Sequence, residues 1–146
     1  KLKALQDEEL YLTDCGACDG QLVVAPSGDI GVCHAFLGEK KYFFDNINRL
    51  KINSKTIFKI ENNKYIREWI RRSPINIPKC YKCPALGICG GGCPYNSYIT
   101  NGSIWNLDKN FCYHAKKTIE WYLWDLYQSF YKQDPKILKR KKIIII

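Results

Sequence analysis

The chain has 146 residues, of which 46% are hydrophobic and 25% are charged, a composition typical of one globular domain and not of a disordered chain. Its formal net charge is +9, but the basic residues are scattered, and the only dense cluster lies in 136–142. A basic terminus of this kind is more often solvated than bound to nucleic acid, so we expect no nucleic-acid partner.

The N-terminal end of the sequence gives no targeting signal. The first 14 residues, KLKALQDEELYLTD, have no apolar run like that of a signal peptide, and no stretch approaches the roughly 18 apolar residues of a membrane span. We therefore expect a cytoplasmic protein with no membrane partner. Because the chain starts with Lys1 and contains no methionine, we interpret 1–14 as a linker from an upstream domain, 15–134 as one domain and 135–146 as a basic and apolar tail.

The segment 21–33, QLVVAPSGDIGVC, predicts a β-hairpin. Two short apolar runs flank a turn in which Pro26 sets the first turn position and Gly28 can take a positive φ. The second strand of this hairpin leads directly to Cys33. A small hairpin followed by helices and cysteine-rich loops is an α+β fold.

The segment 54–72 predicts a helix. Tyr65, Ile66, Trp69 and Ile70 recur at helical spacing on one face, and Ser73-Pro74 ends the segment. After a cysteine-rich loop, the stretch NSYITNGSIWNLDKN is expected to be a connector. Its Asn-Gly pair at 101–102 predicts a turn.

A second helix is predicted over 115–132, where Asp134-Pro135 closes it. Its apolar residues form a stripe that we expect to pack across the domain. The stripe consists of Ile119, Tyr122, Leu123, Leu126, Tyr127 and Phe130.

Eight cysteines dominate the sequence. An even number permits disulfide bonds, but small secreted domains use them because they lack a core, which this chain does not. Close neighbours such as Cys80 and Cys83 also rarely suit a structural bridge. Metal ligation therefore fits the spacing better, and a disulfide framework is kept as an alternative. The cysteines are Cys15, Cys18, Cys33, Cys80, Cys83, Cys89, Cys93 and Cys112.

One metal interpretation is structural zinc, for contact with protein or nucleic acid. Tetrahedral zinc is typically held by two Cys-x2-Cys units separated by a loop, and Cys15-x2-Cys18 with Cys80-x2-Cys83 would form such a pair. The other four cysteines would then need a second site, and they contain no further Cys-x2-Cys unit.

The iron-sulfur interpretation uses the run KCYKCPALGICGGGCPY at 79–95 directly. Bacterial ferredoxins close their cysteine run with Cys-x3-Cys-Pro, and in two-cluster members that last cysteine ligates the other cluster. Cys89-x3-Cys93-Pro94 has this ending. The glycines of 90–92 lack a Cβ, so they would let the backbone wrap closely around a cluster and direct N–H groups at its sulfur atoms.

The complete spacing resembles the SPASM domain, the auxiliary-cluster domain of many radical S-adenosylmethionine enzymes. The matching pattern is Gly28-x4-Cys33, then Cys80-x2-Cys83-x5-Cys89-x3-Cys93, then Cys112, with nine residues between Cys18 and Gly28. The phrase CGACDGQLVVAPSGDIGVCHAFLG also resembles maturases of ribosomally made peptides, which form oxidative crosslinks such as thioethers on a precursor peptide.

The resemblance implies two 4Fe-4S clusters. The second auxiliary cluster would be held by Cys80, Cys83, Cys89 and Cys112. Cys15, Cys18, Cys33 and Cys93 would hold the first. Cys15 and Cys18 are closer together than in the sulfatase-maturing members of the family, and without Cys15 the first cluster would have an iron open to substrate or solvent.

The resemblance also implies what this chain would not do alone. The radical-generating cluster of the family is bound by Cys-x3-Cys-x2-Cys, and here Cys89-x3-Cys93 is followed by Asn96 where the third cysteine would stand. S-adenosylmethionine and a third 4Fe-4S cluster would therefore belong to an upstream barrel domain. We expect this domain to work with that barrel, a precursor peptide and an external electron carrier in electron transfer and substrate contact, without catalysing the reaction alone.

Overall fold

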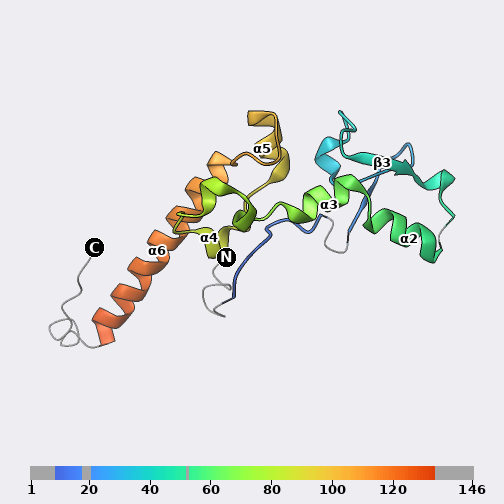
Figure 1. Ribbon diagram of the computed structural model, residues 1–146. Helices are drawn as coiled ribbons and strands as arrows, with labels where there is room; N and C mark the ends of the chain where they lie inside the picture. Colours follow the sequence, from blue (N-terminus) through green and yellow to red (C-terminus); the bar gives the residue numbers. More distant parts are fainter. Residues whose placement is uncertain (1–8, 18–20, 52, 134–146) are drawn as a thin grey trace.

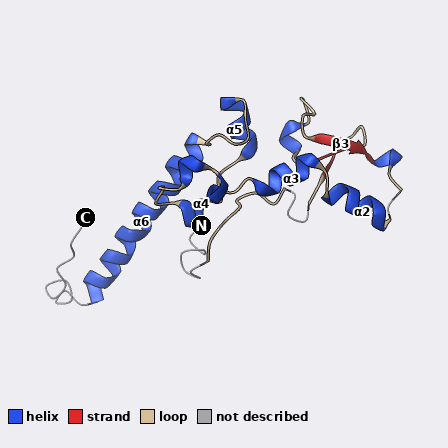
Figure 2. Cartoon of the chain, viewed as in Figure 1, coloured by secondary structure: helices blue, strands red, loops and turns tan. Residues whose placement is uncertain are grey.

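The computed structural model describes residues 9–17, 21–51 and 53–133. Figure 1 shows a long helix, α6 (Lys109–Gln133), extending from one end of the described chain, while the only sheet drawn lies at the opposite end. Figure 2 shows short helices and loops filling the space between them. Among the described cysteines, Cys80, Cys89 and Cys112 lie in helices, and the others lie in the connecting loops.

The sheet has three antiparallel strands in the order β1-β2-β3, formed by Val23–Val24, Asp29–Gly31 and Phe43–Asn46. The predicted hairpin is confirmed as β1 and β2. In its turn Gly28 has φ +82° and donates its N–H to the carbonyl of Ala25 at 2.8 Å. The third strand, β3, has only four residues and was not predicted.

An aromatic core lies between the sheet and the following helices. The first 3₁₀ helix, η1 (His34–Phe36), follows Cys33 directly and places Phe36 at 0% exposure. The ring of Phe36 packs edge-on against Tyr42 and Tyr95, with centroids 4.7 and 4.9 Å away. Cys33 is itself a member of this buried core. Other buried members are Val32, Ile66, Trp69 and Ile104.

The segment predicted as one helix over 54–72 forms two, so that prediction is wrong in this respect. They are α2 (Ser54–Glu61) and α3 (Lys64–Arg71). The break occurs because the side chain of Asn63 accepts the N–H of Tyr65 at 2.9 Å, which caps a new helix. On α3 the predicted inner face is only partly buried, since Ile70 is 60% exposed.

Between α3 and α6 the chain makes a series of short helical turns. After Arg72 come η3 (Pro74–Asn76), η4 (Pro78–Cys80) and α4 (Leu86–Cys89). Proline occupies the first turn of both η3 and η4, where its fixed φ is favourable and its missing N–H costs nothing. This stretch therefore delivers Cys80, Cys83 and Cys89 from tightly turned backbone.

The predicted connector contains a helix, α5 (Pro94–Asn101). Gly102 ends it with φ +73°, so the chain turns at the Asn-Gly pair as predicted, in the form of a helix C-cap. The last helix begins at Lys109, earlier than the predicted start at 115. Cys112 consequently lies on α6 and not in the loop before it.

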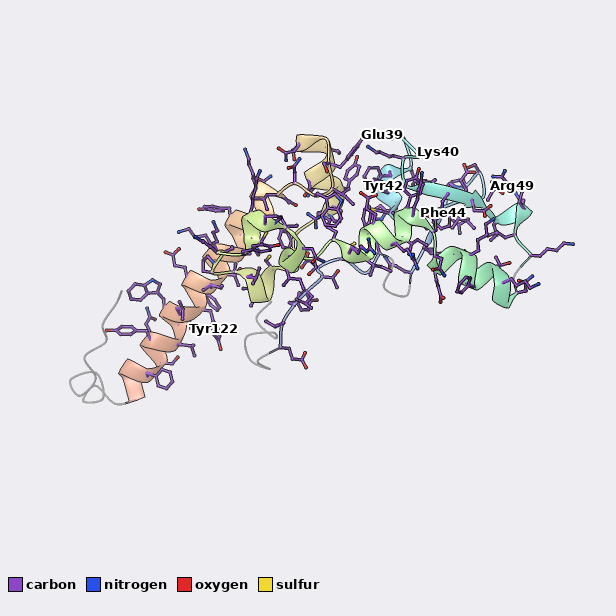
Figure 3. All side chains as sticks on the ribbon, in the orientation of Figure 1. Glu39, Lys40, Tyr42, Phe44, Arg49 and Tyr122 are labelled. Carbon is purple, nitrogen blue, oxygen red and sulfur yellow. The ribbon has the colours of Figure 1, made fainter. Side chains whose placement is uncertain are left out.

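Only the first part of α6 packs against the rest of the described chain, so the predicted stripe across the domain is partly wrong. Ile119 packs beside Ala115 and α4, but Leu123 and Phe130 are 59% and 60% exposed. In Figure 3 Tyr122 lies on α6 well away from the labelled residues around the sheet. The outer half of this helix therefore presents an uncovered apolar and aromatic surface.

The three-stranded antiparallel sheet and the separate helices confirm an α+β fold. Within the predicted 15–134 domain, the aromatic core and the α4–α6 contact form two buried clusters of hydrophobic side chains. The predicted tail 135–146, the closing Asp134 and most of the 1–14 linker lie outside the described residues.

Candidate metal centre

Four cysteines gather where α4 meets α6. Ala85, Ile88 and Ala115 are buried between these helices. The N–H of Cys83 donates to the carbonyl of Cys80 at 2.9 Å, which turns the chain between these two thiols. Contact between α4 and α6 then brings Cys89 and Cys112 to the same region although 23 positions separate them in the sequence.

Electrostatics show that these four thiols are neighbours. Burial raises the pKa of Cys80 to about 11, and Cys89, Cys112 and Cys83 add to the increase. The pKa of Cys112 is likewise raised by burial and then by Cys89 and Cys83. We call Cys80, Cys83, Cys89 and Cys112 the α4–α6 thiol group. A metal or cluster that binds thiolates here must displace protons, so its binding is favoured by rising pH.

A second group lies at the edge of the aromatic core. Burial raises the pKa of Cys33, and the neighbouring thiols of Cys15 and Cys93 raise it further, while backbone N–H groups of Ala35 and Phe36 oppose the increase. Cys33 follows β2, and Cys93 directly precedes α5. We call Cys15, Cys33 and Cys93 the core thiol group.

Cys15 belongs to the core thiol group although it lies far from Cys33 and Cys93 in the sequence. It is half-buried and packs against the aromatic core, and its Sγ accepts the N–H of Ala17 at 3.4 Å. Cys18 lies outside the described residues, so its membership of this group stays a prediction.

The three glycines between Cys89 and Cys93 adopt the left-handed conformation, with φ of 62°, 84° and 71° at Gly90, Gly91 and Gly92. The N–H of Gly91 donates to the Sγ of Cys89 at 3.2 Å. The expectation that these glycines let an N–H group face sulfur is therefore confirmed at one position. Such donors stabilise thiolate and lower the negative charge that a cluster sulfur must carry.

Gly90 also fixes the N-terminal segment. A Cβ placed on it would lie 2.4 Å from the backbone nitrogen of Asp14 and 2.5 Å from the carbonyl carbon of Thr13. No side chain fits there. Glycine at this position allows 13–15 to run against the loop, so that Cys15 approaches Cys93 from a distant part of the sequence.

Asp108 links the two thiol groups. It is 4% exposed and directly precedes α6, where its carboxylate accepts the N–H of Phe111 at 3.1 Å. The same carboxylate accepts the backbone N–H of Cys93 at 3.3 Å and the side-chain amide of Asn96 at 3.2 Å. One side chain thus connects the loop of Cys93 to the helix of Cys112. Asp108 was not predicted, although an aspartate before a helical pattern is a recognisable start signal.

We predict that Asp108→Ala lowers the free energy of unfolding by about 1–3 kcal/mol, because a helix cap is lost and buried N–H groups lose their acceptor. Urea denaturation of the metal-free chain measures this. The matched control is Asp125→Ala on the exposed face of the same helix, which should change stability by less than about 0.5 kcal/mol. Equal effects for the two variants would show that the Asp108 contacts contribute nothing.

Two histidines and an aspartate lie within a few positions of cysteines in the sequence. His34 and His114 are exposed, and the rings of His114 and Phe111 are 6.5 Å apart. Asp29 accepts hydrogen bonds from Ser27, Lys40 and Asn46, which hold the pKa of its carboxyl well below its usual range. Asp29 is therefore a turn residue.

The chemistry of the donors is that of soft thiolates. None of the seven described cysteines forms a disulfide bond with another of them. Among the described residues, no set of three or more His, Cys, Asp or Glu side chains has the arrangement of a metal-ion site. Thiolate is the ligand type that iron-sulfur clusters and zinc use, and in the described residues the thiols of each group lie near one another without forming an assembled site.

No protein-family model matches the sequence, and a comparison with curated proteins finds no match either. In 9–17, 21–51 and 53–133, no helix has the length and apolar character needed to cross a membrane.

Proposed function

We propose that this chain is the auxiliary-cluster domain of a radical S-adenosylmethionine enzyme that modifies a ribosomally made peptide, with two 4Fe-4S clusters as its cofactors. The observation that carries the proposal is the separation of the seven described thiols into a group of four and a group of three. The zinc alternative pairs Cys15 with Cys80 and Cys83, whereas Cys15 acts on Cys33 and belongs to the other group.

Each group would hold one cluster, and the α+β fold would wrap around both. The α4–α6 thiol group supplies a complete set of four thiolates for the second cluster. The core thiol group supplies three for the first, and Cys18 is the proposed fourth. The N–H donors of Gly91 and Ala17 face thiols in the two groups respectively, so both sites have backbone groups that stabilise negative charge on sulfur.

The clusters would supply one-electron redox chemistry, at potentials set by burial and by hydrogen bonds to sulfur. The residues of this chain would bury the centres, orient their ligands and keep water away from them. Free thiols and oxygen-sensitive clusters suit a reducing, cytoplasmic location. The proposed partners are the upstream barrel domain, which would bind S-adenosylmethionine and a third cluster, the precursor peptide, and an external electron carrier.

Anaerobic reconstitution with iron and sulfide tests this function. We expect a brown protein with about eight iron and eight sulfide per chain, the content of two cubane clusters. A parallel reconstitution with zinc and no sulfide is the control. Stoichiometric zinc that iron and sulfide cannot replace would contradict the proposal and favour a structural zinc module.

A further inference from the structure

Arg72 is a buried cation with only neutral hydrogen-bond partners. It is 4% exposed, and its guanidinium donates to the carbonyls of Gly92, Ile104 and Asn106 and to the hydroxyl of Ser97. The contacts to Gly92 and Ser97 are both 3.0 Å. Arg72 forms no ion pair with any carboxylate in the ranges that the structure describes.

Such an arrangement is costly unless negative charge lies nearby. Removing a cation from water costs several kcal/mol, and neutral acceptors recover only part of that. Burial lowers the pKa of Arg72, and the groups that oppose this decrease are Cys93, Asp108, Cys80 and Cys89. Three of these four are thiols, which carry negative charge only when they are ionised, as they are on binding a metal.

Arg72 is placed between the two thiol groups. It binds the carbonyl of Gly92, the residue before Cys93 in the core thiol group. Ser97, another partner, donates its hydroxyl to the carbonyl of Cys93 at 3.0 Å. On the other side, its Nη1 lies 3.4 Å from the position that a Cβ on Gly91 would occupy, and Gly91 donates its N–H to the Sγ of Cys89 in the α4–α6 thiol group. One cation therefore lies against the backbone that carries ligands of both proposed sites.

We propose that Arg72 is the shared counter-charge of two anionic iron-sulfur clusters, a positioning residue that raises the reduction potential of both. This role rests on the proposed function. Four thiolates and a cubane core of charge about +2 give each site a net charge of about −2, and reduction adds another electron. A fixed cation stabilises the more negative, reduced form, so its removal should make both clusters harder to reduce.

The test compares Arg72→Gln with Arg72→Lys in the reconstituted full chain. Redox titration monitored by electron paramagnetic resonance gives the midpoint potential of each cluster. We expect Arg72→Gln to shift both midpoints to more negative potential and Arg72→Lys, which keeps the charge, to stay close to the wild type. Ser97→Ala is the control, because it removes one hydrogen-bond partner of Arg72 and leaves the cation in place.

The outcomes separate this role from the proposed function. A wild type that holds no clusters overturns the proposed function and this role with it. Two clusters with unchanged midpoints in Arg72→Gln overturn the role alone, since a purely structural Arg72 would alter stability in both variants without moving the potentials.

If neither Arg72 variant folds, the wild type decides the question. In chain labelled with ¹⁵N-arginine, both reduced clusters should show magnetic coupling to an arginine nitrogen, because Arg72 is the buried arginine of the described chain. Coupling absent from both clusters, or present at only one, would contradict a shared counter-charge.

Discussion

Gly90→Ala should lower the free energy of unfolding by more than about 3 kcal/mol. The left-handed conformation at φ +62° costs an L-residue roughly 1–2 kcal/mol. The larger part comes from the new Cβ, which would lie 2.4 Å from the backbone of Asp14 and must push that segment away. Urea denaturation of the metal-free chain measures the change. Because Cys15 follows Asp14, the reconstituted variant should also lose iron from the first cluster.

Gly102→Ala is the matched control for this prediction. Gly102 has a similar φ of +73°, but a Cβ placed on it would meet no atom within 4 Å. It therefore measures the conformational cost alone, about 1–2 kcal/mol. If Gly90→Ala were no more destabilising than Gly102→Ala, the packing of Thr13 and Asp14 against the glycine loop would not exist in solution.

The second large effect is expected for Cys93→Ala, which should reduce the iron content from about eight to about four per chain. Cys93 neighbours Cys33, so its loss should damage the first cluster and spare the one held by the α4–α6 thiol group. The backbone contacts of position 93, to Asp108 and Ser97, do not need the thiol and should persist. Iron analysis and electron paramagnetic resonance measure the two clusters separately.

Cys89→Ala is the companion variant and should give the reverse pattern. Cys89 lies in the α4–α6 thiol group, so the second cluster should be lost while the first remains. The two residues are only four positions apart in the sequence, so opposite effects of the two variants would be a strict test of the ligand assignment. Loss of the second cluster alone in Cys93→Ala would refute the assignment.

Local signals in the sequence predicted the first hairpin but not all the helix boundaries. The β1–β2 turn follows from Pro26 and from a glycine at 28, whose positive φ the structure confirms. The break between α2 and α3 was missed because one apolar periodicity runs through both helices and hides the Asn63 cap. The helix α5 was missed because its Asn, Ser and Thr content is typical of a loop, although Pro94 and Gly102 are ordinary start and stop residues.

The site was predictable only in part. Cysteine spacing and the resemblance predict which thiols would hold each cluster, and that assignment of ligands stays a prediction. No short sequence pattern indicates that Arg72 is buried. In the sequence it is simply a charged residue at the end of an amphipathic helix. Its hydrogen-bond partners lie 20 to 34 positions further along the chain, so its burial depends on tertiary contacts that no short pattern records.

The glycine loop also sets an upper limit on the distance between the two proposed centres. Four peptide units join Cys89 to Cys93, so their Cα atoms can be no more than about 14 Å apart even in a fully extended chain. The consecutive left-handed residues bend the loop well away from full extension. Two redox centres built on these ligands would be permanent neighbours, and an electron could cross between them without any hinge, lid or diffusing carrier.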